Sequence, residues 1–273
     1  MTQLPVGRMS VCTGVAVLAL VSSRPVQAED AADLAKKLSN PVAALISVPV
    51  QLNYDQDIGP RDGGDRWTLN VQPVVPIALN DDWNLISRTV LPIVSQDDVF
   101  PGAGSQFGTG DTVQSLFFSP KEPSASGWIW GAGPALLLPT GSDDLLTADK
   151  WGGGPTFVVL KQQGPVTYGL LANHIWSFAG DSARDDLSNT FVQPFLSYTT
   201  PDAWTFGINT ESSYDWEGDR WTVPINGTVS KVTQVGSQLL SVGGGLRYWA
   251  EAPDSGPSGL GFRLFVTFLF PKK

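Results

Sequence analysis

Apolar and polar residues alternate through residues 204–230, whose sequence is WTFGINTESSYDWEGDRWTVPINGTVS. Trp204, Phe206 and Ile208 share one parity, and Ile225 and Val229 continue the apolar set after an acidic turn. A period of two predicts a β-hairpin with one apolar and one polar face. In a soluble sandwich the apolar face would form the core. In a membrane barrel the apolar face would meet lipid, and the polar face would line the interior.

The same pattern predicts twelve strands joined by connections that are alternately short and long. An antiparallel up-and-down barrel with both termini on one side has this alternation, whereas a Greek-key sandwich gives no reason for it. The predicted fold is therefore all-β, a transmembrane barrel of about twelve strands with a short helical segment before it. The predicted strands are Ile46–Tyr54, Trp67–Leu79, Trp83–Ser95, Asp111–Ser119, Gly127–Pro139, Gly152–Gln162, Pro165–Phe178, Asn189–Thr199, Trp204–Tyr214, Trp221–Thr233, Leu239–Ala250 and Gly261–Phe270.

Tryptophan lies mainly at the ends of these strands rather than at their centres. An indole ring has an apolar body and one N–H that seeks water, so it favours the two interfaces of a bilayer. Trp128 and Trp130 remain candidates for ordinary core positions. The predicted interfacial set is Trp67, Trp83, Trp151, Trp176, Trp204, Trp221 and Trp249.

Prolines inside several strands, such as Pro73 and Pro134, count against a fully regular barrel and require bulges or bends. The last strand is rich in alternating aromatic residues and ends at Phe270, as in outer-membrane barrels whose terminal aromatic is read by the barrel-assembly machinery. Residues 271–273 (Pro-Lys-Lys) follow Phe270 and depart from that ending.

The first 28 residues have the features of a cleaved secretory signal: Arg8, an apolar run over residues 11–21 and small residues before Glu29. A buried N-terminal helix is the alternative. The sole cysteine, Cys12, would leave with the signal, so the mature chain would hold no disulfide and no thiol site.

Two further segments follow the predicted signal. Residues 29–45 are expected to form a periplasmic segment, with a short helix over 33–38 that Asn40-Pro41 ends, and this segment could plug the barrel. Residues 46–273 are expected to form the barrel itself.

The net charge of −9 argues against nucleic acid as a partner. No apolar run after residue 28 approaches the roughly 18–20 residues of a transmembrane helix, so a membrane-embedded chain would have to cross with strands. The glycine clusters precede no predicted helix and so are not phosphate loops. We expect no cofactor, no metal site and no catalytic residue.

Several stretches of the chain resemble bacterial outer-membrane proteins of the meta-pathway phenol degradation type, often called transporters and often mislabelled neuromedin U. The resemblance spans nearly the whole mature chain. It implies a β-barrel in the outer membrane of a Gram-negative bacterium and a channel or uptake protein for small molecules, with no catalytic motif to carry over. The stretches are LAKKLSNPVAALISVPVQLNYD (34–55), GAGPALLLPTGSDD (131–144), KWGGGPTFVVLKQQGPVTYGLLANHIWSFAG (150–180), QPFLSYTT (193–200), NTESSYDWEGDRWTVPIN (209–226) and GGGLRYWAEAPDSGPSGLGFRLFVTFLFPK (243–272).

Charged residues on the polar face of the strands are the candidates for a selectivity site. Opposed charges in a narrow lumen can set a constriction and its ion preference. The alternative is that these charges pair with one another and fill the interior, since twelve strands lie between the eight of a filled barrel and the sixteen of an open porin. The candidates are Glu211, Arg247 and Arg263, followed by Arg88, Lys161 and His174.

Most of the acidic residues lie in or beside the long connections. They could bind divalent cations that bridge lipopolysaccharide, or they could be ordinary solvated loops. The expected surroundings are outer-membrane lipids and lipopolysaccharide.

Three functions compete: passage of a small, aromatic or apolar solute, a closed structural or surface-interaction barrel, and a lipid-modifying enzyme. Outer-membrane phospholipases place a serine two residues after the catalytic histidine. Here Trp176 occupies that position after His174, and Ser177 has the opposite parity, so the enzyme is disfavoured. We therefore predict a channel whose solute the sequence does not identify.

Overall fold

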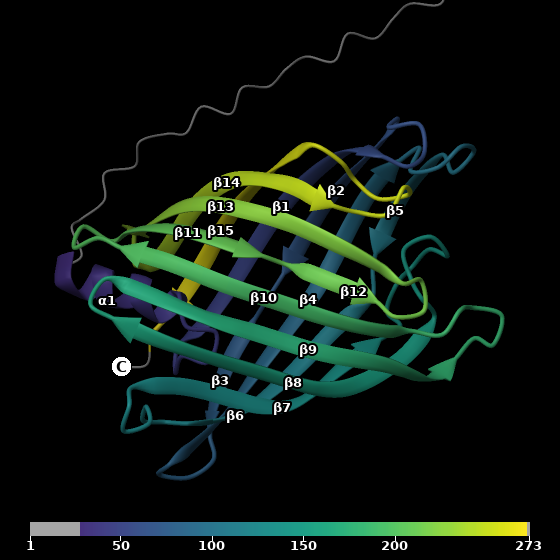
Figure 1. Cartoon of the computed structure of the whole chain (residues 1–273). Helices are drawn as coiled ribbons and strands as arrows, with labels where there is room; N and C mark the ends of the chain where they lie inside the picture. Colours follow the sequence, from purple (N-terminus) through teal and green to yellow (C-terminus); the bar gives the residue numbers. More distant parts are fainter. Residues whose placement is uncertain (1–27, 272–273) are drawn as a thin grey trace, which may run out of the picture.

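The computed structural model describes residues 28–271, a helix followed by an antiparallel sheet that closes on itself (Figure 1). The predicted secretory signal falls on residues outside this range, apart from Ala28. The elements are α1 (Ala28–Leu38), β1 (Ile46–Ile58), β2 (Gly64–Val71), β3 (Val74–Ala78), β4 (Trp83–Asp97), β5 (Ser105–Thr109), β6 (Thr112–Pro120), β7 (Trp128–Leu138), β8 (Lys150–Gln163), β9 (Val166–Gly180), β10 (Ser188–Thr199), β11 (Trp204–Thr210), β12 (Ser212–Asp215), β13 (Arg220–Val235), β14 (Gln238–Glu251) and β15 (Leu260–Phe270).

These strands form a closed barrel of twelve, because three pairs are interrupted halves of one strand. The pairs are β2 with β3, β5 with β6, and β11 with β12. Each strand pairs antiparallel with the next along the chain, and the last strand pairs with the first, where Ile46 lies opposite Phe270. The predicted up-and-down barrel is confirmed.

Proline explains one of the interruptions and fixes the position of an acidic residue. The strand made of β11 and β12 pairs with β10 on one side and with β13 on the other. The register with β10 places Pro194 opposite Thr210, and the register with β13 places Pro224 opposite Glu211. Neither proline has an N–H for the ladder, so the strand breaks between β11 and β12 at Glu211.

Short turns gather at one end of the barrel, together with α1 and the C-terminus, and the long connections gather at the other end (Figure 1). We call these the short-turn end and the long-loop end. Within residues 28–271 no helix has the length and apolar character needed to span a bilayer.

The outer surface of the barrel is apolar, which answers the question raised by residues 204–230. Trp204, Phe206 and Ile208 are 41%, 52% and 51% exposed and face outward, whereas Asn226 on the opposite face is fully buried. The last strand follows the same rule, with Leu264 outward and Arg263 inward and buried. The apolar parity therefore faces the surroundings and the polar parity faces the interior.

The interior is not polar throughout. Val158 and Leu160 of β8 are buried against Ile86, Phe117 and neighbouring apolar residues inside the barrel. Strands β7 and β8 therefore carry apolar residues on both faces, which explains why their sequences alternate less clearly than that of residues 204–230.

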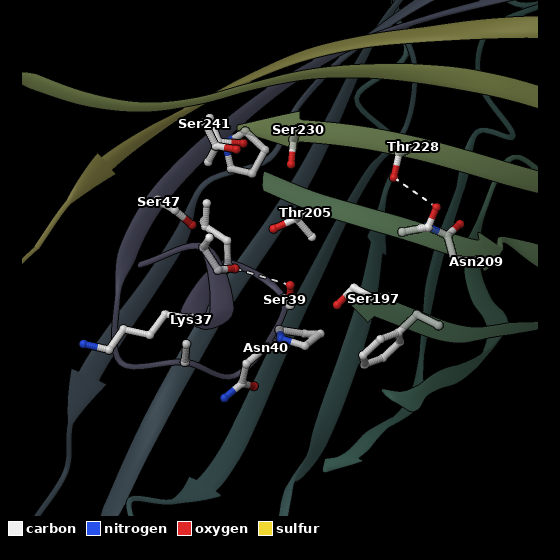
Figure 2. Close-up of a pocket in the computed structure, with 18 of the residues that line it drawn as sticks. Lys37, Ser39, Asn40, Ser47, Ser197, Thr205, Asn209, Thr228, Ser230 and Ser241 are labelled. Atoms are coloured by element: carbon white, nitrogen blue, oxygen red, sulfur yellow. Dashed lines mark hydrogen bonds between the residues drawn. The ribbon is translucent and has the colours of Figure 1, made fainter. Parts of the chain in front are cut away.

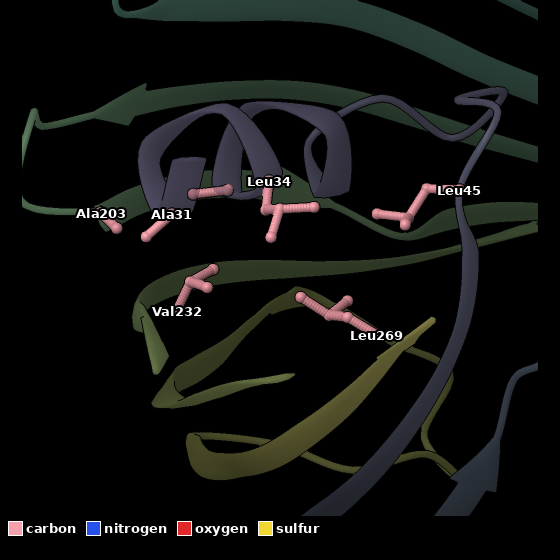
Figure 3. Packing of buried hydrophobic residues seen from close by; sticks show 7 residues of the cluster. Ala31, Leu34, Leu45, Ala203, Val232 and Leu269 are labelled. Atoms are coloured by element: carbon pink, nitrogen blue, oxygen red, sulfur yellow. The ribbon is translucent and has the colours of Figure 1, made fainter. Parts of the chain in front are cut away.

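Helix α1 lies inside the short-turn end and packs against the barrel wall (Figure 3). Its buried residues Ala31, Leu34 and Ala35 share one face, because residues three and four apart lie on the same side of a helix. They contact Val232 of β13 and Leu269 of β15. The side chain of Gln162 also donates a 2.9 Å hydrogen bond to the Lys36 carbonyl, so the helix is held by apolar contacts and by a capped terminal carbonyl.

Candidate functional site

An internal ion cluster joins the last strand to the break between β11 and β12. Arg263 Nη1 and Nη2 donate to the two carboxylate oxygens of Glu211, at 2.9 and 2.7 Å. Arg263 Nε donates to Asn53 Oδ1 on β1 at 2.7 Å, and Arg263 is only 3% exposed. This two-pronged geometry is the strong form of an arginine–carboxylate pair.

Arg247 extends the cluster toward the long-loop end. Its Nε lies 3.6 Å from Asp55 Oδ1, and its Nη2 lies 3.9 Å from Glu211 Oε2. The guanidinium carbon of Arg247 stands 4.3 Å from the centre of the Trp249 ring, whose Nε1 donates to Asp55 Oδ1 at 2.9 Å. Asp55 is buried, so the paired arginine and the indole N–H compensate its lost hydration.

The three leading candidates of the sequence analysis are thus brought together. Glu211, Arg247 and Arg263 all lie in the interior and are linked by charge. Mutual pairing of the interior charges is the alternative to a selectivity site that the sequence left open. Glu211 and Arg247, though not Arg263, also border a cavity of about 380 Å³, so this side of the cluster forms part of the wall of the lumen.

Arg88 of β4 borders the same central cavity as Glu211 but makes no direct contact with the cluster. Its Nη2 donates to Gln72 Oε1 at 3.3 Å, and within residues 28–271 no carboxylate oxygen lies within 4.0 Å of its guanidinium. Arg88 borders a cavity of about 510 Å³ in the middle of the barrel. It also borders a pocket of about 300 Å³ next to α1.

The pocket next to α1 has a mixed lining in which serine and threonine hydroxyl groups stand among apolar side chains (Figure 2). Ser47, Ser197 and Ser230 project from the barrel wall, and Ser39 and Asn40 come from the segment that follows the helix. Gln72, Arg88 and Gln193 line both this pocket and the central cavity, so these three side chains form the boundary between the two spaces.

Lys161 does not lie in the lumen. It alternates with Leu160, which is buried inside, and with Gln162, which contacts the helix, so it faces outward. Its ammonium stands 5.7 Å from the centre of the Trp128 ring near the short-turn end.

His174 also faces outward. Its neighbours Asn173 and Ile175 line the central cavity, and its own ring lies 4.0 Å from the Trp176 ring. Its Nδ1 is 2.7 Å from Thr190 Oγ1, whereas the hydroxyl of Ser177 contacts Asp186 and the Leu187 N–H. Of the lumen and the interface near Trp176, His174 occupies the second. His174 and Ser177 do not form the histidine–serine contact that a hydrolase needs.

Tryptophans gather at both ends of the outer surface. Trp83 and Trp204 lie near the short-turn end, and Trp67, Trp151, Trp176 and Trp221 lie near the long-loop end. Trp249 is the exception, because it shares the inward parity of Arg247 and donates to Asp55 inside the barrel. Trp128 and Trp130 are outward residues rather than core residues.

Two interior residues escaped the sequence reasoning. Asp55 was counted with the acidic loops, although it continues the inward parity of Ser47 and Asn53 along β1. Arg66 donates to Gln96 Oε1 at 2.8 Å and borders the same cavity as Asp55. Extending the alternation of each strand past its predicted end would have found both.

The acidic loops are partly tied to the chain. Asp111 accepts hydrogen bonds from Gly141 N, Thr147 Oγ1 and Ala148 N, and Lys150 Nζ lies 3.0 Å from Asp186 Oδ1. Hydrogen bonds from Lys150 and Ser177, together with the lysine charge, lower the pKa of the exposed Asp186 carboxyl. In the described part of the chain no group of three or more His, Cys, Asp or Glu side chains has a metal-binding arrangement.

The fold is similar to those of solved outer-membrane barrels. No protein-family model matches the chain, and no curated protein matches it. The structure is similar to an outer membrane channel from Pseudomonas putida F1, with a TM-score of 0.65 and 16% identity over 83% of this chain and 96% of that one. A KdgM porin has a TM-score of 0.48 and 12% identity over 82% of this chain and 99% of that one. Outer membrane phospholipase A from Escherichia coli has a TM-score of 0.46 and 10% identity over 83% and 97%. At 16% identity, the likeness to the Pseudomonas channel shows a shared closed-barrel fold.

Proposed function

We propose that this protein is a channel of a Gram-negative outer membrane that passes a small aromatic or apolar solute. The observation that carries the proposal is the pair of internal spaces, about 510 and 300 Å³, that meet at Gln72, Arg88 and Gln193 inside an outwardly apolar barrel. The fold it shares with a Pseudomonas outer membrane channel supports the same proposal.

The outer surface supports insertion into a bilayer. Side chains such as Phe206, Leu246 and Leu264, each more than half exposed, cover it between the two sets of tryptophans. An apolar band between aromatic girdles is the pattern of membrane barrels, whose short turns face the periplasm. We infer that α1 lies at the periplasmic mouth and that the long acidic loops face outward, toward lipopolysaccharide.

The interior supports an apolar or aromatic solute rather than a sugar or a free ion. Leu137, Leu171, Ile175 and Phe191 line one side of the central cavity. Apolar walls with a few polar groups are typical of sites for small organic molecules, because the walls replace water around the apolar part of the ligand.

Single-channel recording tests the proposal. The mature protein, from residue 29 on, would be refolded and inserted into a planar bilayer, and a heat-dependent shift in gel mobility would show that it is folded. Discrete and reproducible current steps are expected. A folded barrel without current would contradict an open channel.

A closed structural barrel is the second candidate, and α1 is the observation that favours it. The helix fills part of the short-turn end and is anchored by Leu34 and by the bond from Gln162. If the helix obstructs the mouth, a variant lacking residues 29–45 will conduct and the intact chain will not. Equal silence in both would support a barrel that serves only structure or surface contact.

We propose that the protein has no enzymatic activity and that its signal peptide ends at Ala28. We also propose that it belongs to the outer-membrane proteins of the meta-pathway phenol degradation type. Phospholipid turnover by the wild type that Ser177→Ala abolishes would overturn the first point. N-terminal sequencing of the membrane-extracted protein should begin at Glu29 and would settle the second.

A further inference from the structure

We propose that the central cavity binds an organic monoanion with an apolar body, and that Arg88 holds its charged group. The inference rests on the proposed function, because it names the chemical class of the solute. It starts from a contrast between two kinds of lining in the same cavity.

The central cavity has two kinds of lining. Apolar side chains come from β4, β6, β7, β9 and β10, and amide side chains come from β1, β2, β9 and β10, including Gln51 and Asn70. A ligand that fits both kinds of lining has an apolar part and a polar end. The apolar lining consists mainly of Val90, Val113, Leu137, Leu171, Ile175 and Phe191.

Arg88 of β4, which donates to Gln72, supplies a positive charge in this cavity. A guanidinium has five N–H donors, and Arg88 uses one of them, on Gln72, in the described part of the chain. Arg263, by contrast, donates three hydrogen bonds, two of them to the carboxylate of Glu211 and one to Asn53, so its charge is already paired. The unused fork of Arg88 matches the two oxygens of a carboxylate, and a charged pair formed in a cavity away from bulk water is stronger than one at the surface.

The acids near this cavity do not pair directly with Arg88. Glu211 and Asp111 also line it, and the charge of Glu211 acts on Arg88 from beyond 4.0 Å. The carboxylate of Glu211 accepts both of its hydrogen bonds from Arg263 and also has Arg247 at 3.9 Å, and Asp111 accepts from three donors of the loop over residues 141–148. Arg88 is therefore the group available to an incoming anion.

The position of Arg88 makes it a determinant of specificity and not only a binding residue. Because Arg88, Gln72 and Gln193 border both the central cavity and the pocket next to α1, a solute that moves between the two spaces passes the guanidinium. A neutral solute of the same shape would meet the same walls without the charge interaction.

Binding of benzoate and of benzamide, which has the same shape without the charge, tests the proposal. The folded full-length mature barrel would be placed in nanodiscs of zwitterionic lipid, with empty nanodiscs as the background, and binding followed by calorimetry at pH 7. We expect benzoate to bind at least about tenfold more tightly than benzamide, as a charge-assisted hydrogen bond provides. Acetate, which lacks the apolar body, should bind more weakly than benzoate.

Arg88→Gln should abolish the preference for benzoate and leave benzamide binding unchanged. Arg61→Gln is the control, because Arg61 is exposed in the connection between β1 and β2. Equal affinity of the wild type for benzoate and benzamide would overturn the proposal, and so would a preference that survives in a folded Arg88→Gln barrel. If Arg88→Gln does not fold, the wild-type comparison of the two probes and Arg88→Lys, which should retain part of the preference, decide the matter.

Failure of the channel and failure of this site are separable. Preferential benzoate binding without any current would leave the site standing and remove the channel. Current with no preference for benzoate over benzamide would leave the channel standing and remove the site.

Discussion

Neutralising Glu211 is the sharpest test of the internal ion cluster. In Glu211→Gln, the amide oxygen can still accept one hydrogen bond from Arg263, but the second bond and the negative charge are lost. Arg263 is 3% exposed, so its charge then remains buried with only neutral acceptors, the substituted amide and Asn53, and with the positive Arg247 nearby. Breaking a buried pair on one side costs about 3–5 kcal/mol.

The assay is equilibrium unfolding by urea of the barrel in lipid vesicles, followed by tryptophan fluorescence. The control is Asp215→Asn, which removes the Arg220–Asp215 pair at 3.1 Å. That pair is solvent-exposed, with the Arg220 side chain 54% accessible, so its loss should cost less than about 1 kcal/mol.

The double variant Glu211→Gln/Arg263→Gln adds a second criterion. Because it removes both charges together, its loss of stability should be smaller than the sum of the two single losses. Equal, small losses for Glu211→Gln and Asp215→Asn would refute the reasoning, since they would mean that the interior cluster is as well solvated as the surface pair.

Three further predictions follow from the structure. Arg247→Gln/Arg263→Gln removes two positive charges from the lumen wall, so the reversal potential in a KCl gradient should move toward cation preference; an unchanged potential would take both residues out of the ion pathway. The lowered pKa of Asp186 means that its bond to Lys150 supports the loop fully above the ordinary aspartate range and is lost as the pH falls through the lowered value. The hydrogen-exchange protection factors of residues 180–188, calculated against the intrinsic rate at each pH, should therefore fall on acidification in the wild type, and Asp186→Asn should show low protection already at pH 7. Gly245→Ala should destabilise the barrel by about 1–3 kcal/mol, because a Cβ there would lie 2.0 Å from the Gly227 carbonyl oxygen, whereas Gly227→Ala meets open space and should be nearly neutral in the same urea titration.

The sequence was most informative where one face of a strand is apolar and the other polar. Residues 204–230 and the last strand are of this kind, so their parity and the inward position of Arg263 could be predicted directly. Trp249 was assigned to an interface from its place at a strand end, but its indole N–H is satisfied by Asp55 inside the barrel. Parity, which it shares with Arg247, was the better guide.

Lys161 and His174 could not be placed in the same way. Strand β8 has Val158 and Leu160 inside and Val159 outside, and β9 has Asn173 inside and His174 outside. When apolar or polar residues occupy both faces, the alternation of a single strand does not identify the face. Pairing with neighbouring strands is needed, and that information lies far away in the chain.

The seam between β1 and β15 ties the start of the barrel to its end. Ile46 pairs with Phe270, and Leu269 of the last strand is one of the residues against which α1 packs. A chain that has not yet added its last strand therefore leaves two open strand edges and lacks one part of the surface on which the helix rests. Closure requires the most distant contact in the sequence, which is the slow kind of step in folding. The helix can therefore pack against Leu269 only after the whole barrel has been assembled, so α1, which precedes the first strand, becomes fully packed only when the last strand is in place.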